Sequence, residues 1–449
     1  SLFSIFLGYS LITLFPEETD LNWRQSMSIT AIIWLIYMFI GAIPLFLSGH
    51  YNSYLDACFE SMSALATTGL VLVNDLDHMA HCYNFWRHFM CFIGGQGIIL
   101  IGLIIFFKGT SAFKIYVGEG REEKILPNIF KTAKFIWFVS SCYLIIFTLV
   151  IGIINIFFNG FSPNRAFFHA LCIFMAGWDT AGFAVQSQNI NYYHNPLIEI
   201  LTSLIACLGA LNFGLHYSIW TGKIKEIFKN YELKVFLISI TILTIFTFLV
   251  FSKNSSSLNF FANFRVVSYQ LISSHTGVGY SNIDSFSLKN WPELSLIFLV
   301  IAMGFGGCSC STSGGIKMLR IGLIIKEIKK EIKLYTSPTA SIIIEKFHHL
   351  KDIELADSQV KTSSIILILF IFTYFLGSLI GTFYGYPFLY SIFESTSACA
   401  NVGLSVGITN PSMPNLLKIV YIFEMYLGRL EFLSVFVFIS YLFSLRSKE

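Results

Sequence analysis

Long apolar runs alternate with short polar segments along the whole chain. A helix that crosses a lipid bilayer needs about 20 mostly apolar residues. The runs that reach or approach this length are 26–48, 85–107, 136–158, 196–219, 235–251, 291–325, 364–383 and 416–443. The pattern predicts an all-α polytopic membrane protein.

Between the two members of each successive pair of runs lies a shorter apolar segment with a glycine near its end. These segments are 54–71, 163–183, 262–280 and 387–405. The first and the last match at eight of twelve positions, from Phe59 to Leu70 and from Phe393 to Leu404. Because an internal repeat sets the architecture, we expect four repeats of span, pore helix and span around a central pore with approximate fourfold symmetry.

The polar loops divide the chain into these repeats. Repeat 1 covers 23–118, repeat 2 covers 119–228, repeat 3 covers 229–345 and repeat 4 covers 346–449. In the preceding residues 1–22, the apolar stretch 2–14 has no basic region before it and no cleavage site after it. We expect this stretch to be the remnant of an additional N-terminal membrane helix and not a signal peptide.

Composition and charge placement support a membrane protein with defined sidedness. Hydrophobic residues make up 55% of the chain and charged residues only 12%, whereas soluble domains carry about 25% charged residues. Of the 29 Lys and Arg, 22 fall on the side where consecutive repeats are joined or where the chain starts and ends, in loops such as 121–134, 223–234 and 326–361. By the positive-inside rule these loops are cytoplasmic, and the pore helices enter from the outside. The net charge of +3 arises from these loops, and it gives little reason to expect nucleic-acid binding.

Each pore helix is followed by a tripeptide that ends in glycine, which we call a filter triplet. Glycine adopts positive φ readily and lets the backbone approach closely. A short helix aims the negative end of its dipole at the pore, and backbone carbonyl oxygens can replace the hydration shell of a cation. We therefore expect an ion-binding selectivity filter. Its residues are Thr67, Thr68 and Gly69, Thr180, Ala181 and Gly182, Gly277, Val278 and Gly279, and Asn401, Val402 and Gly403.

Three carboxylates lie close to these triplets. Glu60 and Glu394 occupy equivalent positions in two pore helices, and Asp179 directly precedes a triplet. Carboxylates at membrane depth are costly and face the protein interior or a watery cavity. We favour a bracing role for Glu60 and Glu394, in which they accept hydrogen bonds from the filter backbone, over direct contact with ions.

The run 291–325 is interrupted between residues 304 and 315 by five glycines and by small polar or thiol residues. Irregular backbone at membrane depth is tolerated only against protein or a water-filled cavity. We favour a mobile gate loop below the filter over a close-packed helix seam, which small residues also permit. The gate residues are Gly306, Gly307, Cys308, Ser309, Cys310, Ser311, Thr312, Ser313, Gly314 and Gly315.

Arg429 lies inside the last apolar run, where a guanidinium costs about 2.5–3.5 kcal/mol on insertion scales. It therefore needs a partner or an aqueous wall. Glu424 and Glu431 are the nearby candidates for a structural ion pair.

Long sequence blocks resemble the Trk/Ktr/HKT superfamily of potassium transporters, and its TrkH-type membrane subunits most closely. They are Phe-Trp-Arg-His-Phe-Met-Cys-Phe-Ile-Gly-Gly-Gln-Gly from Phe85, Gly-Gly-Cys-Ser-Cys-Ser-Thr-Ser-Gly-Gly-Ile-Lys from Gly306, and Leu-Gly-Arg-Leu-Glu-Phe from Leu427. The resemblance extends from Trp23 to Arg446. It implies potassium uptake through a filter with four glycines, where a serine in place of the first is associated with sodium permeation. It also implies an intramembrane gate at 304–315 and an electrostatic barrier at Arg429.

The resemblance further implies a bacterial cytoplasmic membrane protein that forms a homodimer on a cytosolic, TrkA-like ring of nucleotide-binding subunits. The basic loop 326–361 is the expected docking surface. The chain itself would bind no cofactor, with K⁺ as the transported ion. A sodium- or proton-coupled secondary cation transporter, KtrB-like or other, with weaker potassium selectivity remains the alternative. Asp179, His275 and Asn401 break the fourfold symmetry of the filter, which bears on its discrimination against sodium.

The secondary-transporter alternative and one other function class have weaker support. A secondary transporter usually has two inverted halves instead of four parallel loops. A membrane-embedded enzyme would need paired catalytic groups, and no convincing pair is present. Cys308 and Cys310 lack a second ligand pair with the spacing of a zinc site, and His348 with His349 is most simply a solvated pair in a charged loop.

Overall fold

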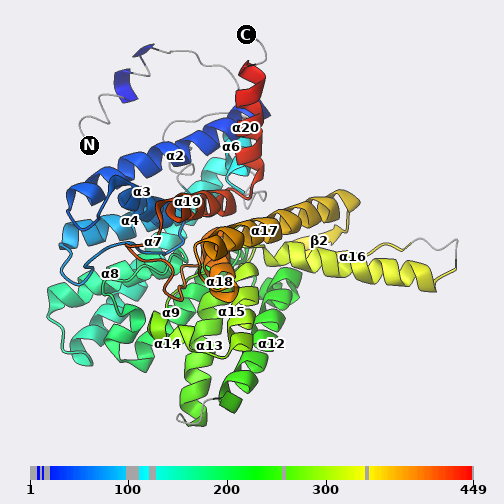
Figure 1. The fold of residues 1–449 in the computed structure, drawn as a ribbon. Helices are drawn as coiled ribbons and strands as arrows, with labels where there is room; N and C mark the ends of the chain where they lie inside the picture. Colours follow the sequence, from blue (N-terminus) through cyan, green and yellow to red (C-terminus); the bar gives the residue numbers. More distant parts are fainter. Residues whose placement is uncertain are drawn as a thin grey trace.

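The computed structural model describes residues 8–10, 13–14, 21–97, 111–120, 128–254, 259–338 and 343–446. Most of the expected N-terminal remnant, residues 1–22, lies outside the described residues. The described part is mainly helical (Figure 1).

Each repeat begins with a long straight helix followed by a shorter one. The pairs are α2 (Trp23–Leu47) and α3 (Tyr54–Leu65), α7 (Ile129–Phe157) and α8 (Pro163–Trp178), α12 (Tyr231–Asn254) and α13 (Phe260–Thr276), and α17 (Asp357–Phe383) and α18 (Phe388–Cys399). All four long helices are long and apolar enough to cross a membrane. The short helices begin at local start signals. The hydroxyl of Ser53 accepts a hydrogen bond from the backbone N–H of Asp56 at the start of α3, and Pro163 lies in the first turn of α8.

The second spans are broken wherever the structure describes them completely. The pieces are α9 (Pro196–Gly209) and α10 (Phe213–Trp220), α15 (Glu293–Gly304) and α16 (Met318–Thr336), and α19 (Asn415–Arg429) and α20 (Leu433–Arg446). In repeat 1, α4 (His81–Gln96) is followed by residues 98–110, which lie outside the described part. The interruption predicted in 291–325 is present, whereas the uninterrupted spans predicted for 196–219 and 416–443 are wrong.

The breaks have identifiable causes in the backbone. Helices α9 and α10 meet at 102° because the backbone between them bonds to the gate loop: Ala210 O accepts from Cys308 N, and Phe213 N donates to Cys310 O. Between α19 and α20, Glu431 and Phe432 have positive φ values of 49° and 68°. Such values interrupt a right-handed helix.

The chain is not entirely helical. Strands β1 (Lys346–His349) and β2 (Lys351–Glu354) form an antiparallel hairpin between α16 and α17, which the sequence reading missed. The prediction that His348 and His349 are a solvated pair is also wrong. His349 is buried, and hydrogen bonds to Glu226 and then to Asp352 hold the pKa of His348 above its usual value.

Short connecting helices complete the described part: α6 (Ser111–Gly118), η1 (Asn189–Tyr193), α11 (Lys225–Lys229) and α14 (Ser285–Lys289). The four short pore helices and the helices that follow them contact one another in a closed order, α3, α4, α8, α9, α13, α15, α18, α19 and again α3. Helices α16 and α17 pack together and extend to one side (Figure 1). The four pore helices therefore surround a common centre.

Candidate functional site: a ring of four triplets above a loop

The filter triplets begin where the four pore helices end. The first residue of every triplet has positive φ: 55° at Thr67, 51° at Thr180, 76° at Gly277 and 54° at Asn401. For a β-branched residue such as threonine this conformation is a genuine outlier. Strained backbone of this kind is kept where the surrounding structure determines it, often at functional sites. The four triplets thus share one backbone shape despite their different side chains.

The last residues of the triplets interlock in a closed ring, which we call the filter ring. A methyl group built on Gly69 would lie 2.1 Å from the carbonyl oxygen of Ala181. A methyl group on Gly182 would lie 2.1 Å from Val278 O. One on Gly279 would lie 1.8 Å from Val402 O, and one on Gly403 would lie 2.1 Å from Thr68 O. Each glycine therefore packs against the middle carbonyl of the next repeat, and all four have positive φ. Only glycine fits these positions without displacing a neighbour.

Glu60 and Glu394 brace the chain just after the triplets. Glu60 accepts from Leu72 N at 2.9 Å, and Glu394 accepts from Val406 N at 2.9 Å, twelve residues later in each case. Both carboxylates are fully buried. Both carboxylates thus accept backbone N–H groups as predicted, although the donors follow the filter triplets and do not belong to them. Arg87, in the first half of α4, is buried and forms an ion pair with Glu60 at 2.6 Å.

Asp179 and Asn401 connect the filter ring to its surroundings. Gln96 Nε2 donates to Asp179 Oδ1 at 2.8 Å, and Gln96 Oε1 accepts from Ser140. Asn401 Nδ2 donates to Thr68 Oγ1 at 2.9 Å and to Met425 O at 3.0 Å. The amide of Asn401 therefore joins the triplets of repeats 4 and 1, and it helps to hold the ring closed.

The gate loop is irregular backbone with its two ends held together. Gly306 N donates to Ile316 O at 3.0 Å and Met318 N donates to Gly307 O at 3.1 Å. Within the loop, Gly307 N donates to Ser313 Oγ at 2.9 Å. This segment is a folded loop and not a helix seam.

The gate loop lies directly against the first positions of the filter triplets. Thr312 Oγ1 is 3.5 Å from Thr180 Oγ1. A methyl group on Gly277 would lie 2.9 Å from Ser313 Oγ, and one on Gly314 would lie 2.8 Å from the Cβ of Asn401. The loop thus contacts three of the four triplets.

Arg429 completes the contact at repeat 1. Its Nη1 donates to Thr67 Oγ1 at 3.2 Å and to Thr312 O at 2.9 Å, and its Nη2 donates to Gly94 O at 2.6 Å. The ion pairs suggested by sequence are not formed, because Glu431 pairs with Arg320 and Glu424 accepts from Ser395. Arg429 therefore links the filter ring, the gate loop and α4.

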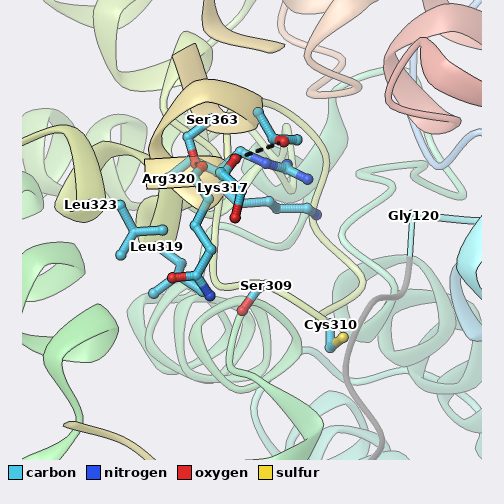
Figure 2. A pocket seen from close by; sticks show the side chains of 11 residues that line it. Gly120, Ser309, Cys310, Lys317, Leu319, Arg320, Leu323 and Ser363 are labelled. Atoms are coloured by element: carbon cyan, nitrogen blue, oxygen red, sulfur yellow. Dashed lines mark hydrogen bonds between the residues drawn. The ribbon is translucent and has the colours of Figure 1, made fainter. Parts of the chain in front are cut away.

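Cavities lie on both sides of this layer. One of about 360 Å³ is lined by Gly69, Gly279 and Gly403, together with Asn189 and Asp284. Another of about 270 Å³ lies beyond the gate loop, where Ser309, Cys310, Lys317 and Arg320 line it (Figure 2). Among the described residues, no group of three or more His, Cys, Asp or Glu is placed to hold a metal ion.

The architecture defines a polytopic helical membrane protein in which four short pore helices meet at one ring. A family model described as TrkH, cation transport protein, matches residues 1–444. The chain belongs to the TrkH family of cation transport proteins. The predicted family resemblance and membrane fold are thereby confirmed.

Individual relatives agree with this assignment. An uncharacterized cation transporter of Methanocaldococcus jannaschii is 32% identical over 95% of this chain and 84% of its own length. The Trk system potassium uptake protein TrkG of Escherichia coli is 28% identical over 94% of this chain and 85% of its own length. The crystal structure of the potassium transporter TrkH from Vibrio parahaemolyticus matches with a TM-score of 0.76 at 24% identity, covering 94% and 86% of the two chains. This last similarity concerns the fold.

Proposed function

We propose that this chain conducts potassium ions through the filter ring. The observation that carries the proposal is the closed series of glycine-to-carbonyl contacts, which brings carbonyl groups of four repeats to one centre. Carbonyl oxygens arranged in this way can replace the hydration shell of K⁺. The C-terminal ends of four pore helices add favourable negative potential, about half an elementary charge each. The relatives whose names include potassium uptake support the same ion.

In this proposal the gate loop and Arg429 block the path below the ring. The guanidinium is only half-buried and donates to Thr67 Oγ1 and Thr312 O. A fixed positive charge next to a cation path raises the barrier for cations. Displacing the loop, with Arg429 following through Thr312, opens the path toward the cavity at Ser309.

Regulation and assembly follow the family resemblance. The chain acts as a homodimer in a bacterial cytoplasmic membrane, on a cytosolic TrkA-like ring of nucleotide-binding subunits. Helix α16, the hairpin and their charged side chains form a surface for such a partner. Lys326 and Lys333, which both pair with Glu345, lie on this surface.

Rubidium uptake into proteoliposomes tests potassium conduction. We expect selective ⁸⁶Rb⁺ uptake that K⁺ inhibits and Na⁺ does not, and we expect Arg429→Ala to increase it. Lack of selective uptake, even with the ring subunit present, would refute the proposal.

An ion-coupled secondary transporter is the second candidate. The first residues of the triplets, Thr67, Thr180, Gly277 and Asn401, differ and lower the symmetry of the filter, which fits the weaker potassium selectivity of this candidate. In this case uptake would require an inward sodium or proton gradient, whereas a passive pathway would follow the rubidium gradient alone.

A further inference from the structure

Glu232, the second residue of α12, lies far from the filter ring in sequence and holds the gate loop through a buried carboxylate. Its side chain is fully buried. Glu232 Oε1 accepts from Ser309 N at 2.5 Å and from Leu319 N at 3.1 Å, and Oε2 accepts from Ser309 Oγ at 3.0 Å. One carboxylate therefore binds three elements together: α12, the gate loop and the start of α16.

These hydrogen bonds suit an ionised carboxylate. Leu319 N is in the first turn of α16, where backbone N–H groups have no partner within the helix. A negative charge at a helix N-terminus is also stabilised by the helix dipole. Hydrogen bonds to charged groups are stronger than those between neutral groups. Removing the charge of Glu232 therefore weakens the hold on both Ser309 and Leu319.

Ser309 is the part of the gate loop with room to move. In the segment 306–315 it is the half-buried residue, whereas the others are buried. The cavity of about 270 Å³ lies against Ser309, Cys310 and Leu319 (Figure 2). The opposite part of the loop, at Thr312 and Ser313, lies against Thr180 and Gly277, the first residues of two filter triplets. A loop released at Ser309 can therefore move away from the ring into this cavity.

The hairpin reaches the same carboxylate. His349 Nδ1 lies 3.7 Å from Glu232 Oε2 and 3.4 Å from Asn230 Nδ2. The turn residue Leu350 packs against α10, where a methyl group on Gly214 would lie 2.5 Å from its side chain. A partner that moves the hairpin would therefore disturb Glu232 directly.

We infer that Glu232 is a positioning residue that holds the gate loop in its blocking position and couples it to the hairpin 346–354. The inference rests on the proposed function, because it assumes that the loop blocks conduction. A displacement of the hairpin moves His349, which contacts Glu232, and Glu232 in turn contacts Ser309. Release of Ser309 then lets the loop move away from the filter ring.

The test measures ⁸⁶Rb⁺ uptake by full-length protein in proteoliposomes without a regulatory subunit. Glu232→Gln should raise uptake about tenfold, the shift expected from weakening a hydrogen bond to a charged group. The matched control is Glu226→Gln, because Glu226 pairs with His348 on the same hairpin and does not contact the gate loop. That variant should keep the original rate. Unchanged uptake by correctly folded Glu232→Gln protein would overturn the inference.

Two further comparisons separate a gating effect from general damage. Ser309→Ala should raise uptake by itself and add little to Glu232→Gln, because both weaken the contact between the same two residues. His349→Ala should raise uptake more than His348→Ala, its neighbour on the strand. Fully additive effects of Glu232→Gln and Ser309→Ala, or equal effects of the two histidine variants, would contradict the coupling.

Cys310 provides a readout on the loop itself. It is buried and lines the cavity. In Glu232→Gln protein, N-ethylmaleimide should modify Cys310 faster, as followed by peptide mass spectrometry, while Cys58 and Cys399 in the pore helices remain unreactive. Equal reactivity of Cys310 in both proteins would refute release of the loop. If Arg429→Ala also fails to raise uptake, the proposed gate is wrong. If Arg429→Ala raises uptake and Glu232→Gln does not, only the role of Glu232 is wrong.

Discussion

Repeats 1 and 4 place the same glutamate in the same pore-helix motif and stabilise it in two different ways. Glu60 is paired with the buried guanidinium of Arg87, and its brace to the chain is a single backbone bond from Leu72. Glu394 instead accepts from two hydroxyls, Ser405 and Thr409, and from the backbone of Val406 and Ile408. Repeat 1 therefore compensates the charge of its glutamate with an opposite charge, whereas repeat 4 does so with hydroxyl and backbone N–H donors.

The difference shows what the symmetry of the pore requires. The bond from the backbone twelve residues later is kept in both repeats, so the position of the chain after the triplet is the shared feature. How the remaining charge is satisfied is free to differ. The ion pair makes repeat 1 dependent on a partner from α4, whereas repeat 4 satisfies Glu394 within its own loop.

Arg87→Met should have the largest effect, because it leaves Glu60 buried without its cation. Breaking a buried ion pair by removing one partner costs about 3–5 kcal/mol. Thermal unfolding of the detergent-solubilised protein should show a strongly lowered Tm. The double variant Glu60→Gln/Arg87→Met should recover part of the loss. A single variant as stable as the original protein would mean that the ion pair does not hold repeat 1.

The same substitution in both repeats tests the contrast directly. Glu394→Gln removes the charge but retains one acceptor oxygen, and it should cost about 1–3 kcal/mol. Glu60→Gln should cost more, because it leaves Arg87 buried and unpaired. The Tm values of the two variants, measured side by side, check this order. Equal losses would remove the distinction between the two repeats.

Serine substitutions compare the filter glycines of the two repeats. Gly69 and Gly403 have φ values of 88° and 94°, and a Cβ at either would lie 2.1 Å from a carbonyl oxygen. We expect Gly69→Ser and Gly403→Ser each to reduce the preference for Rb⁺ over Na⁺ by about tenfold, or about 1.4 kcal/mol. Uptake of ⁸⁶Rb⁺ in competition with Na⁺ measures this preference. Unchanged selectivity in both variants would contradict the filter assignment. A loss of selectivity in Gly69→Ser alone would mean that the glycine of repeat 1 matters for selectivity and that of repeat 4 does not.

The smallest effect concerns the bond that joins the two repeats. Asn401→Ala and Thr68→Val each remove the hydrogen bond between Asn401 Nδ2 and Thr68 Oγ1. A double-mutant cycle should show a coupling of about 0.5–1.5 kcal/mol, the usual contribution of a neutral hydrogen bond. The coupling energy is obtained from the unfolding midpoints of the original protein, the two single variants and the double variant. Strictly additive changes would show that repeats 1 and 4 are independent at this point.

Hydrophobic run length and glycine placement predicted the four short helices and the turns at Gly69, Gly182, Gly279 and Gly403 closely, while the role of these turns as an ion filter stays a prediction. Both signals are local: a short apolar helix cannot span, and a glycine is needed where the chain turns. The equivalent spacing of Glu60 and Glu394 from the triplets similarly predicted their bracing role.

Tertiary contacts decided the features that the sequence reading missed. Apolar composition says nothing of whether Arg87 points outward or toward Glu60. The bend between α9 and α10 depends on bonds to the gate loop, although Gly209 and Asn212, whose Oδ1 accepts from Gly214 N, are stop and start signals that could have indicated it. Glu232 lies more than seventy residues before Ser309, so no local pattern connects them.

The filter ring also has a genetic consequence. A pore built from four identical chains receives every mutation four times, and one substitution alters the whole circle at once. Here each quarter is encoded separately, so selection can change Asn401 or Asp179 while the other three quarters stay as they are. The cost is that no quarter is redundant, because each glycine packs against the carbonyl of the next repeat. Replacing any one of these four glycines by a larger residue is therefore enough to disrupt the filter ring.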